Sequence, residues 1–328
     1  MRRGAPRRER GAALLAVLLL VAVTGAIAVT AMERLSLSRT IASNAAMIAQ
    51  ARAHARGVEQ LSLLVIDDLI ARDPERTTLE GGWLGATRSM PMPGGAVAEA
   101  RLLDGGNCFN LNSVVEGDPR SRLVRRNSGV QQFAGLMIAL RVPEVDARRI
   151  AEAAADWADS DIEQGPAGAE DSAYANAEPP YRTANTLFAD PAEARLLAGM
   201  TADLYDRLRP WLCVHPAAEL SPLNVNTLTA EQAPLLAMLA PGQIDIGRAE
   251  RVLAARPRGG WANIIDFWRT ERLSELAVPL DTQLQPQVRT RWFRLDVRVT
   301  QGDIDYGESV LIDARLRPSR LASRRRED

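Results

Sequence analysis

The feature that most constrains this chain is an uncharged apolar run close to its N-terminus. No charged residue lies between Arg10 and Glu33, and the intervening residues are dominated by Ala, Val and Leu. About 20 apolar residues, each rising ~1.5 Å along a helix, can cross a hydrocarbon core roughly 30 Å thick. The sequence therefore predicts a membrane-spanning helix at the start of the chain.

The apolar run could instead belong to a cleaved secretory signal, which also has a basic front and an apolar middle. Ala26-Ile27-Ala28 fits a small-x-small cleavage site, but neither Gly nor Pro interrupts residues 26–56 and helical spacing continues to about residue 70. Apolar residues recur there every three or four positions, as on the buried stripe of a helix. The stripe consists of Ile41, Ala45, Ile48, Ala51, Ala55, Val58, Leu61, Val65 and Leu69. We therefore expect one long helix that is apolar all round in its first half and amphipathic in its second.

A short basic leader that ends in Gly and runs directly into a long apolar helix resembles the type IV pilin class. In that class a prepilin peptidase removes the leader on the cytoplasmic side, which implies cleavage between Gly11 and Ala12 here. Major pilins have Glu at the fifth mature position, where this chain has Ala16. An ionised carboxylate in lipid is kept only where it has a partner, such as the amine of a neighbouring subunit. A subunit without it needs no neighbour ahead, so the resemblance implies a minor pseudopilin at a filament tip.

The charge distribution predicts the orientation of the chain in the membrane. The leader holds five arginines and one glutamate, a net charge of +4, so its removal takes the chain from −1 to −5. Excess arginine before an apolar span favours a cytoplasmic N-terminus. We expect a single-pass inner-membrane protein whose C-terminal body is periplasmic in a Gram-negative cell. Its near-neutral charge argues against a surface that coats nucleic acid, and its 46% hydrophobic residues suffice for one or two packed domains.

The only two cysteines are Cys108 and Cys213. An even count in an oxidising compartment favours a disulfide between them, and two buried thiols are the alternative. A zinc site built from these cysteines with His54 and His215 is not expected, because their spacing matches no zinc-ligand pattern.

Strand patterns lie on both sides of a helical segment. Residues 97–104 and 292–300 alternate in hydrophobicity, and a turn at Gly302-Asp303 leads from the second run into a hairpin partner at 306–315. Between them, residues 127–286 have helical spacing. We expect an α+β fold in which a pilin-like helix packs on an antiparallel sheet that carries a large inserted α-helical domain. The expected divisions are the leader 1–11, membrane span 12–32, helix and first strands 33–126, insertion 127–286, and C-terminal strands with tail 287–328.

The most chemically informative segment is residues 156–174, where acidic side chains flank a Gly-Pro turn. Asp159, Asp161 and Glu163 alternate before the turn, and Glu170-Asp171 follow it. Calcium takes roughly six to eight oxygen ligands in irregular geometry, whereas magnesium demands a tighter octahedron. The spacing is not that of an EF-hand, and a solvated acidic loop at a helix end is the alternative interpretation.

Four motifs, in the same order along the chain, resemble the K-type minor pseudopilins of the type II secretion system. They are residues 106–112 (GNCFNLN), 156–161 (DWADSD), 168–171 (GAED) with Tyr174, and 223–227 (LNVNT). The resemblance implies a pilin fold with an inserted α-domain, which caps the pseudopilus with I- and J-type minor pseudopilins above the other pseudopilins. It also implies structural calcium held by Asp159, Asp161, Glu170 and Asp171, with Asp156 and Glu163 as further candidates. The expected function is to initiate and cap a filament that moves folded proteins across the outer membrane.

Two other classes of function match single features of the sequence. Residues 223–270 resemble a helix-hairpin-helix module, which elsewhere binds DNA, so a pilus-linked DNA-handling or adhesion protein is the alternative. DNA binding needs exposed amides and nearby cations, and only the turn at 256–261 offers both. We expect no nucleic-acid partner. We also expect no enzymatic activity, because the chain has two histidines and no nucleophile elbow, phosphate loop or metalloprotease helix motif.

Overall fold

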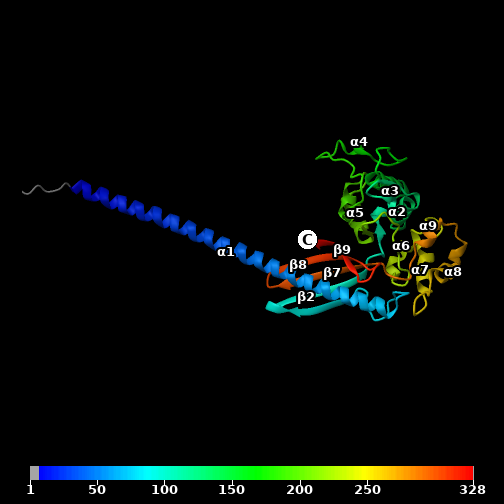
Figure 1. Ribbon diagram of the computed structural model, residues 1–328. Coiled ribbons are helices and arrows are strands. Elements are labelled where there is room, and N and C mark those ends of the chain that lie inside the picture. Colours follow the sequence, from blue (N-terminus) through cyan, green and yellow to red (C-terminus); the bar gives the residue numbers. More distant parts are fainter. Residues whose placement is uncertain (1–6, 328) are drawn as a thin grey trace, which may run out of the picture.

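The computed structural model describes residues 7–327, and its longest element is the single helix α1 (Arg7–Arg72). The first half of α1 projects away from the rest of the molecule, and its second half lies across a sheet (Figure 1). The apolar part has a mean hydropathy of 2.8 and is 0% buried in the protein, so it meets the length and composition of one membrane span. Of the expected leader, residues 1–6 lie outside the described residues, and residues 7–11 continue α1.

The sheet has five antiparallel strands in the spatial order β1-β2-β7-β8-β9. Their bounds are β1 (Thr87–Met92), β2 (Ala96–Asp104), β7 (Trp292–Gln301), β8 (Ile304–Asp313) and β9 (Arg320–Glu327). The predicted C-terminal hairpin is confirmed, since β7 and β8 pair from Trp292↔Asp313 to Gln301↔Ile304 around Gly302. The predicted strand at 97–104 is also present. The two edge strands β1 and β9 are additional to the strands that the sequence predicts.

The long helix packs on one face of this sheet through small and branched side chains. The buried helix residues are Ala51, Ala55, Val58, Ile66 and Ile70. Side chains alternate between the two faces of each strand, and the apolar ones face the helix. These are Leu295, Val297, Val299, Val310 and Ile312. The predicted stripe is correct at Ala51, Ala55 and Val58, and Leu69 is partly buried against the same core. It is wrong at Ile41, Leu61 and Val65, which are 60%, 54% and 58% exposed. Apolar residues spaced three and four positions apart can lie on either of two neighbouring faces of a long helix. The face that contacts the sheet is the one that is buried.

The inserted region leaves the sheet after β2 and returns to it at β7. Its main helices are α2 (Asn127–Ala139), α3 (Glu144–Ala158), α4 (Asp171–Tyr174), α5 (Ala202–Leu208), α6 (Ala233–Ala237), α7 (Ile246–Ala254), α8 (Ile264–Arg269) and α9 (Leu280–Leu284). Short 3₁₀ turns lie before or between these helices, namely η2 (Leu111–Val114), η3 (Pro191–Leu196), η4 (Arg209–Trp211), η5 (Ala230–Gln232) and η6 (Thr270–Glu275), whereas η1 (Pro93–Gly95) joins β1 to β2 in the sheet. The insertion has its own hydrophobic core, in which Phe109 and Phe133 stack with ring centroids 4.6 Å apart.

The insertion also contains four short strands. Three of them lie between β2 and α2, and the fourth follows α5. β3 (Phe109–Asn110) pairs in parallel with β6 (Leu212–Cys213), and β4 (Val115–Asp118) pairs with β5 (Arg122–Arg125). The side chains of Phe109, Val115 and Leu123 belong to the core of the insertion, not to the core beneath α1. Residues 105–126, which the sequence groups with the pilin-like part, therefore pack with the inserted helices. The pilin-like fold with a large helical insertion is itself as predicted.

Candidate functional site

The acidic segment forms a loop between α3 and α4. Asp159 is the C-cap of α3, where an extended backbone (φ −73°, ψ 172°) turns the chain out of the helix. Its carboxylate, that of Asp161 and that of Glu170 each place an oxygen within 4.8 Å of the other two. Leu123 of β5 holds the loop in place, because its N–H donates to Ser160 Oγ and its carbonyl accepts from the Ser160 N–H. The fold thus gathers three of the four expected ligands.

Two of the three carboxylates are buried with an oxygen that lacks any hydrogen-bond donor. Asp159 is 4% exposed and Glu170 is 6% exposed, and Asp159 Oδ1 and Glu170 Oε1 have no partner among the described residues. Burial, together with the charges of Asp161, Asp156 and Glu170, raises the pKa of Asp159 to about 7. Burial also raises the pKa of Glu170. Buried like charges without donors are costly unless a cation neutralises them, so this donor set fits a hard divalent ion.

Asp156 supports the loop from one turn earlier in α3. It is 1% exposed, and its Oδ2 accepts a hydrogen bond from the Gly165 N–H at 3.1 Å. A Cβ at Gly168 would collide with the same carboxylate, so the chain can approach this closely only because residue 168 is glycine. Gln164 Nε2 donates to the Gly168 carbonyl at 2.7 Å and closes the loop. Asp156 therefore shapes the loop that carries the three gathered carboxylates.

Asp171 and Glu163 are not part of the group of three carboxylates formed by Asp159, Asp161 and Glu170. Asp171 Oδ1 accepts from the Thr183 N–H at 3.0 Å and from Thr183 Oγ1 at 2.9 Å, so this oxygen already has donors. Arg182 lies 3.8 Å from its other oxygen. Glu163 is exposed on the outer side of the loop. A ligand role for Asp171 stays a prediction, and the geometry places it beside the three gathered carboxylates.

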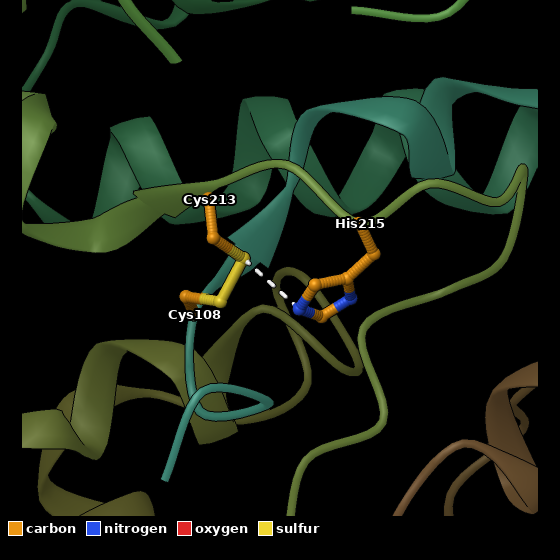
Figure 2. Close-up of side chains that lie close together, drawn as sticks. All are labelled: Cys108, Cys213 and His215. Carbon is orange, nitrogen blue, oxygen red and sulfur yellow. Dashed lines mark hydrogen bonds between the residues drawn. A yellow bond between two sulfur atoms is a disulfide. The ribbon is translucent and has the colours of Figure 1, made fainter. Parts of the chain in front are cut away.

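The two cysteines form a disulfide next to a buried histidine (Figure 2). The Cα atoms of Cys108 and Cys213 are 5.8 Å apart, and the bond ties the start of β3 to the end of β6. His215 Nε2 lies 3.7 Å from Cys213 Sγ (Figure 2). The same nitrogen lies 2.9 Å from the Gly105 carbonyl oxygen. Burial lowers the pKa of His215 to about 4, so this imidazole is neutral. With both sulfurs bonded to each other, neither is available as a thiolate for zinc.

A buried polar network joins the insertion to the sheet. Asp104 at the end of β2 accepts hydrogen bonds from Thr227 Oγ1 at 2.7 Å and Thr290 Oγ1 at 2.5 Å. Asn107 Oδ1 accepts from the Asn224 N–H at 2.9 Å. Burial raises the pKa of Asp104 to about 6, although four hydrogen-bond donors oppose that rise. The Asn-rich motifs at 106–112 and 223–227 therefore join the insertion to the sheet. Asp104, just before the first motif, was not among the residues predicted from the sequence.

The turn that best suited DNA binding is used inside the protein. Arg256 is half-buried and donates from Nη1 to the carbonyls of Val225 at 3.2 Å and Leu228 at 2.7 Å. The Trp261 N–H donates to Asn226 Oδ1 at 2.7 Å, next to Gly260. This turn therefore braces the LNVNT motif, and Arg258 is its one remaining exposed cation within the described chain.

The expected cleavage position lies within α1. Gly11 and Ala12 are both helical and exposed, and Ala16 follows one turn later without a carboxylate. The surrounding apolar side chains are exposed over most of their surface, for example Leu14 at 63% and Leu18 at 57%. This end of the helix therefore makes no contact that would fix its position within the protein, and its apolar surface is available to lipid or to other helices.

Comparisons with known proteins match most of the chain to one family. Two family models described as type II secretion system (T2SS), protein K, match residues 107–217 and 223–289. Type II secretion system protein K of Pectobacterium carotovorum subsp. carotovorum is 33% identical over 93% of this chain and 92% of its own length. The corresponding protein of Pseudomonas aeruginosa is 35% identical over 92% of this chain and 87% of its own length.

One solved structure has the same fold over nearly its full length. It comes from the crystal structure of the GspK-GspI-GspJ complex of the enterotoxigenic Escherichia coli type 2 secretion system. The match has a TM-score of 0.72 and 28% sequence identity, and it covers 85% of this chain and 96% of that chain. Both the sheet beneath α1 and the inserted helices therefore have a counterpart of known structure.

Proposed function

The chain belongs to the type II secretion system protein K family, and we propose that it serves as the minor pseudopilin that initiates and caps the pseudopilus. The observation that carries this proposal is the match of the whole body to a chain solved in complex with GspI and GspJ. The protein is a component of a secretion machine, in which its role is mechanical. Its residues supply packing surfaces and a site that fits a structural ion.

The position of the insertion accounts for capping. The inserted helices lie beyond the end of the sheet that is opposite the free, N-terminal half of α1 (Figure 1). A filament that grows from the membrane receives new subunits at the membrane end of its helices. A bulky domain at the far end leaves no room for another subunit above, and it does not obstruct additions below.

The N-terminal half of α1 supplies the anchor. Its 0% burial leaves its apolar surface for the lipid and then for the helices of other pseudopilins. Ala16 replaces the carboxylate that would pair with the amine of a subunit ahead, in agreement with a leading position. The arginine-rich leader directs the N-terminus to the cytoplasm, where a prepilin peptidase would cut between Gly11 and Ala12, and it leaves the body in the periplasm.

The partners follow from the related complex. We propose that the I- and J-type minor pseudopilins bind this chain, and that the other pseudopilins continue the filament below them. Leu61, Leu64 and Val65 are 54%, 67% and 58% exposed on the side of α1 that the sheet leaves free. Such an apolar helix face fits the packing of one pseudopilin helix on another.

Calcium is the proposed structural ion of the loop between α3 and α4. Asp159, Asp161 and Glu170 would hold it, and loop carbonyls and water would complete the roughly six to eight oxygens that calcium takes. The ion would offset the burial and the neighbouring negative charges that raise the pKa of Asp159, and it would make the loop rigid. The unpartnered buried oxygens of Asp159 and Glu170 support this assignment.

Co-purification tests the proposed role. The full chain is co-expressed with candidate I- and J-type minor pseudopilins encoded nearby and is purified in detergent through a tag on this chain, once in calcium and once in chelator. A stoichiometric three-way complex is expected in calcium. Recovery of the folded chain with neither partner in both buffers would contradict the tip role. A complex that forms equally well in chelator would remove calcium from assembly and leave the tip role intact.

A further inference from the structure

The last strand of the sheet is unusually basic for this protein. The C-terminal arginines are Arg315, Arg317, Arg320, Arg324, Arg325 and Arg326, in a chain whose formal net charge is −1. Arg315 is paired with Asp313 and Arg324 with Glu59. The other four are exposed, and among the described side chains only Arg325 of these four forms an ion pair. The nearest contact among them joins Arg325 to Asp190 at 3.6 Å.

The strand that carries these arginines is an open edge. β9 pairs with β8 on one side, and residues 320–326 are all exposed. On its other side, no hydrogen bond from elsewhere in the described chain reaches the backbone of β9. An edge strand with unpaired N–H and C=O groups is a template for a further strand. The opposite edge, β1, contains Pro91, which has no N–H to offer, whereas β9 contains no proline.

Two side-chain contacts tie the open edge to α1. The Ser319 N–H and Oγ both donate to Asp67 Oδ1, at 3.0 and 2.7 Å, just before β9 begins. In the middle of β9, Arg324 makes two hydrogen bonds to Glu59 of the same helix. A strand already fixed in extended form needs little further ordering when a second strand adds to it.

Cations lie on both faces of this edge. Arg324 and Arg326 are opposite Val310 and Glu308, which point toward α1, and Arg326 lies 5.8 Å from the Tyr306 ring. Arg325 is opposite Ser309 and reaches Asp190 of the insertion on the other face. An added strand would therefore meet positive charge above and below its backbone. Like charges directly opposite destabilise a strand pair, so two copies of β9 repel each other and an acidic strand is attracted.

We propose that β9 is a docking edge for an extended, acidic segment of another protein, which adds to the sheet as a sixth strand. Backbone hydrogen bonds along β9 would supply the affinity, and the arginines would select acidic side chains. The open edge belongs to the single chain, and the proposal makes no use of the tip role.

Hydrogen exchange with a designed peptide tests the docking edge. The probe is a short labelled peptide that alternates glutamate with valine, added to the full chain in detergent. Binding is followed by fluorescence anisotropy, and exchange is followed over residues 320–327. We expect saturable binding and slowed exchange confined to β9. N-methylation of alternate peptide amides should weaken binding at least about tenfold, because several backbone hydrogen bonds are lost.

Two matched variants separate the edge from general charge attraction. Arg320→Glu on β9 should weaken peptide binding severalfold, whereas Arg88→Glu, an exposed arginine on the opposite edge strand β1, should leave it unchanged. Equal binding of the N-methylated peptide would overturn the proposal, as would equal protection of β9 by anionic phosphatidylglycerol vesicles or duplex DNA. Unchanged exchange at β9 in the presence of excess peptide would overturn it as well.

Discussion

Glu59 of α1 and Arg324 of β9 form a bidentate ion pair, with Nε 2.6 Å from Oε1 and Nη2 2.5 Å from Oε2. The Glu59 side chain is only 2% exposed, whereas Arg324 is 38% exposed. The pair links the helix that enters the membrane to the last strand of the sheet, 265 residues later in the chain. It also explains why the edge strand lies against α1.

Arg324→Gln should destabilise the protein, because it leaves the buried Glu59 carboxylate without its cation. Loss of one partner of a buried pair costs roughly 3–5 kcal/mol, and the partial exposure of Arg324 reduces the expected cost to about 2 kcal/mol. Denaturant unfolding of the detergent-solubilised chain measures it. Arg320→Gln, an exposed arginine of the same strand, is the matched control and should change stability by less than about 0.5 kcal/mol. Equal effects of the two variants would contradict a role for the pair.

Glu308 should make stability fall as the pH rises. It is 2% exposed, accepts from Tyr306 OH at 2.8 Å, and its pKa is raised from 4.5 to about 7 by burial and then by Glu59. Below pH 4.5 it is protonated in both states. Between pH 4.5 and about 7 the folded state must keep a proton that the unfolded state releases, so this contribution to stability is lost across that window.

The matched measurement compares Glu308→Gln with the unchanged protein across that pH range. The variant cannot ionise, so its stability relative to the unchanged protein should increase from pH 5 to about pH 7 and then level off. A difference that stays constant over this range would show that Glu308 has an ordinary pKa in the folded protein.

The sequence predicted the parts of the fold that local pattern determines. The long helix follows from the uninterrupted run after Gly25, and the β7–β8 hairpin from clean alternation around Gly302. The edge strands were not predictable in this way. β1 contains Pro91, and β9 is a run of arginines with almost no β-branched or aromatic residues, so pairing with the neighbouring strand is what makes each extended.

The candidate site was predictable in composition and only partly in geometry. The alternation of Asp159 and Asp161 indicated a cation loop, and both lie with Glu170 as expected. The sequence could not tell that Asp171 would accept hydrogen bonds from Thr183, because Thr183 approaches only through the folded return of the chain. Similarly, Asp104 gave no local signal, since its partners Thr227 and Thr290 lie far along the chain.

Calcium should raise the melting temperature of the chelator-treated protein, because an ion that binds only the folded state stabilises it by mass action. Asp159→Asn should abolish most of this rise. In chelator, the same variant should be more stable than the unchanged protein at pH 8, because it lacks a buried carboxylate whose pKa is raised to about 7. Glu163→Gln is the matched control, since this exposed carboxylate lies on the same loop.

Glycine variants test the shape of the same loop. Gly168→Ala places a methyl group against Asp156 and should weaken calcium stabilisation, whereas Gly259→Ala meets nothing within 4 Å and should not. No change in melting temperature with chelator at any calcium concentration would contradict the metal assignment.

Loss of the disulfide should destabilise the insertion, where it ties the chain beside β3 to β6. Cys108 and Cys213 are 105 residues apart, and a loop of this length is stabilised by roughly 4–5 kcal/mol in the chain-entropy model, with measured values nearer 2–4 kcal/mol. The double variant Cys108→Ala/Cys213→Ala should therefore lower the free energy of unfolding by about 3 kcal/mol. Reductant should destabilise the unchanged protein and leave the double variant unaffected. If reductant left the free energy of unfolding of the unchanged protein the same, the stabilising role of the disulfide would be contradicted.

The position of the protein on the pseudopilus tests its proposed role most directly. Isolated filaments are labelled with gold-conjugated antibody against the inserted domain and viewed by electron microscopy, with antibody against the major pseudopilin as the control that labels the whole length. We expect label at one end of each filament only, the end that leads away from the membrane. Label distributed along the filament would show that the insertion does not prevent further addition and would contradict the capping role.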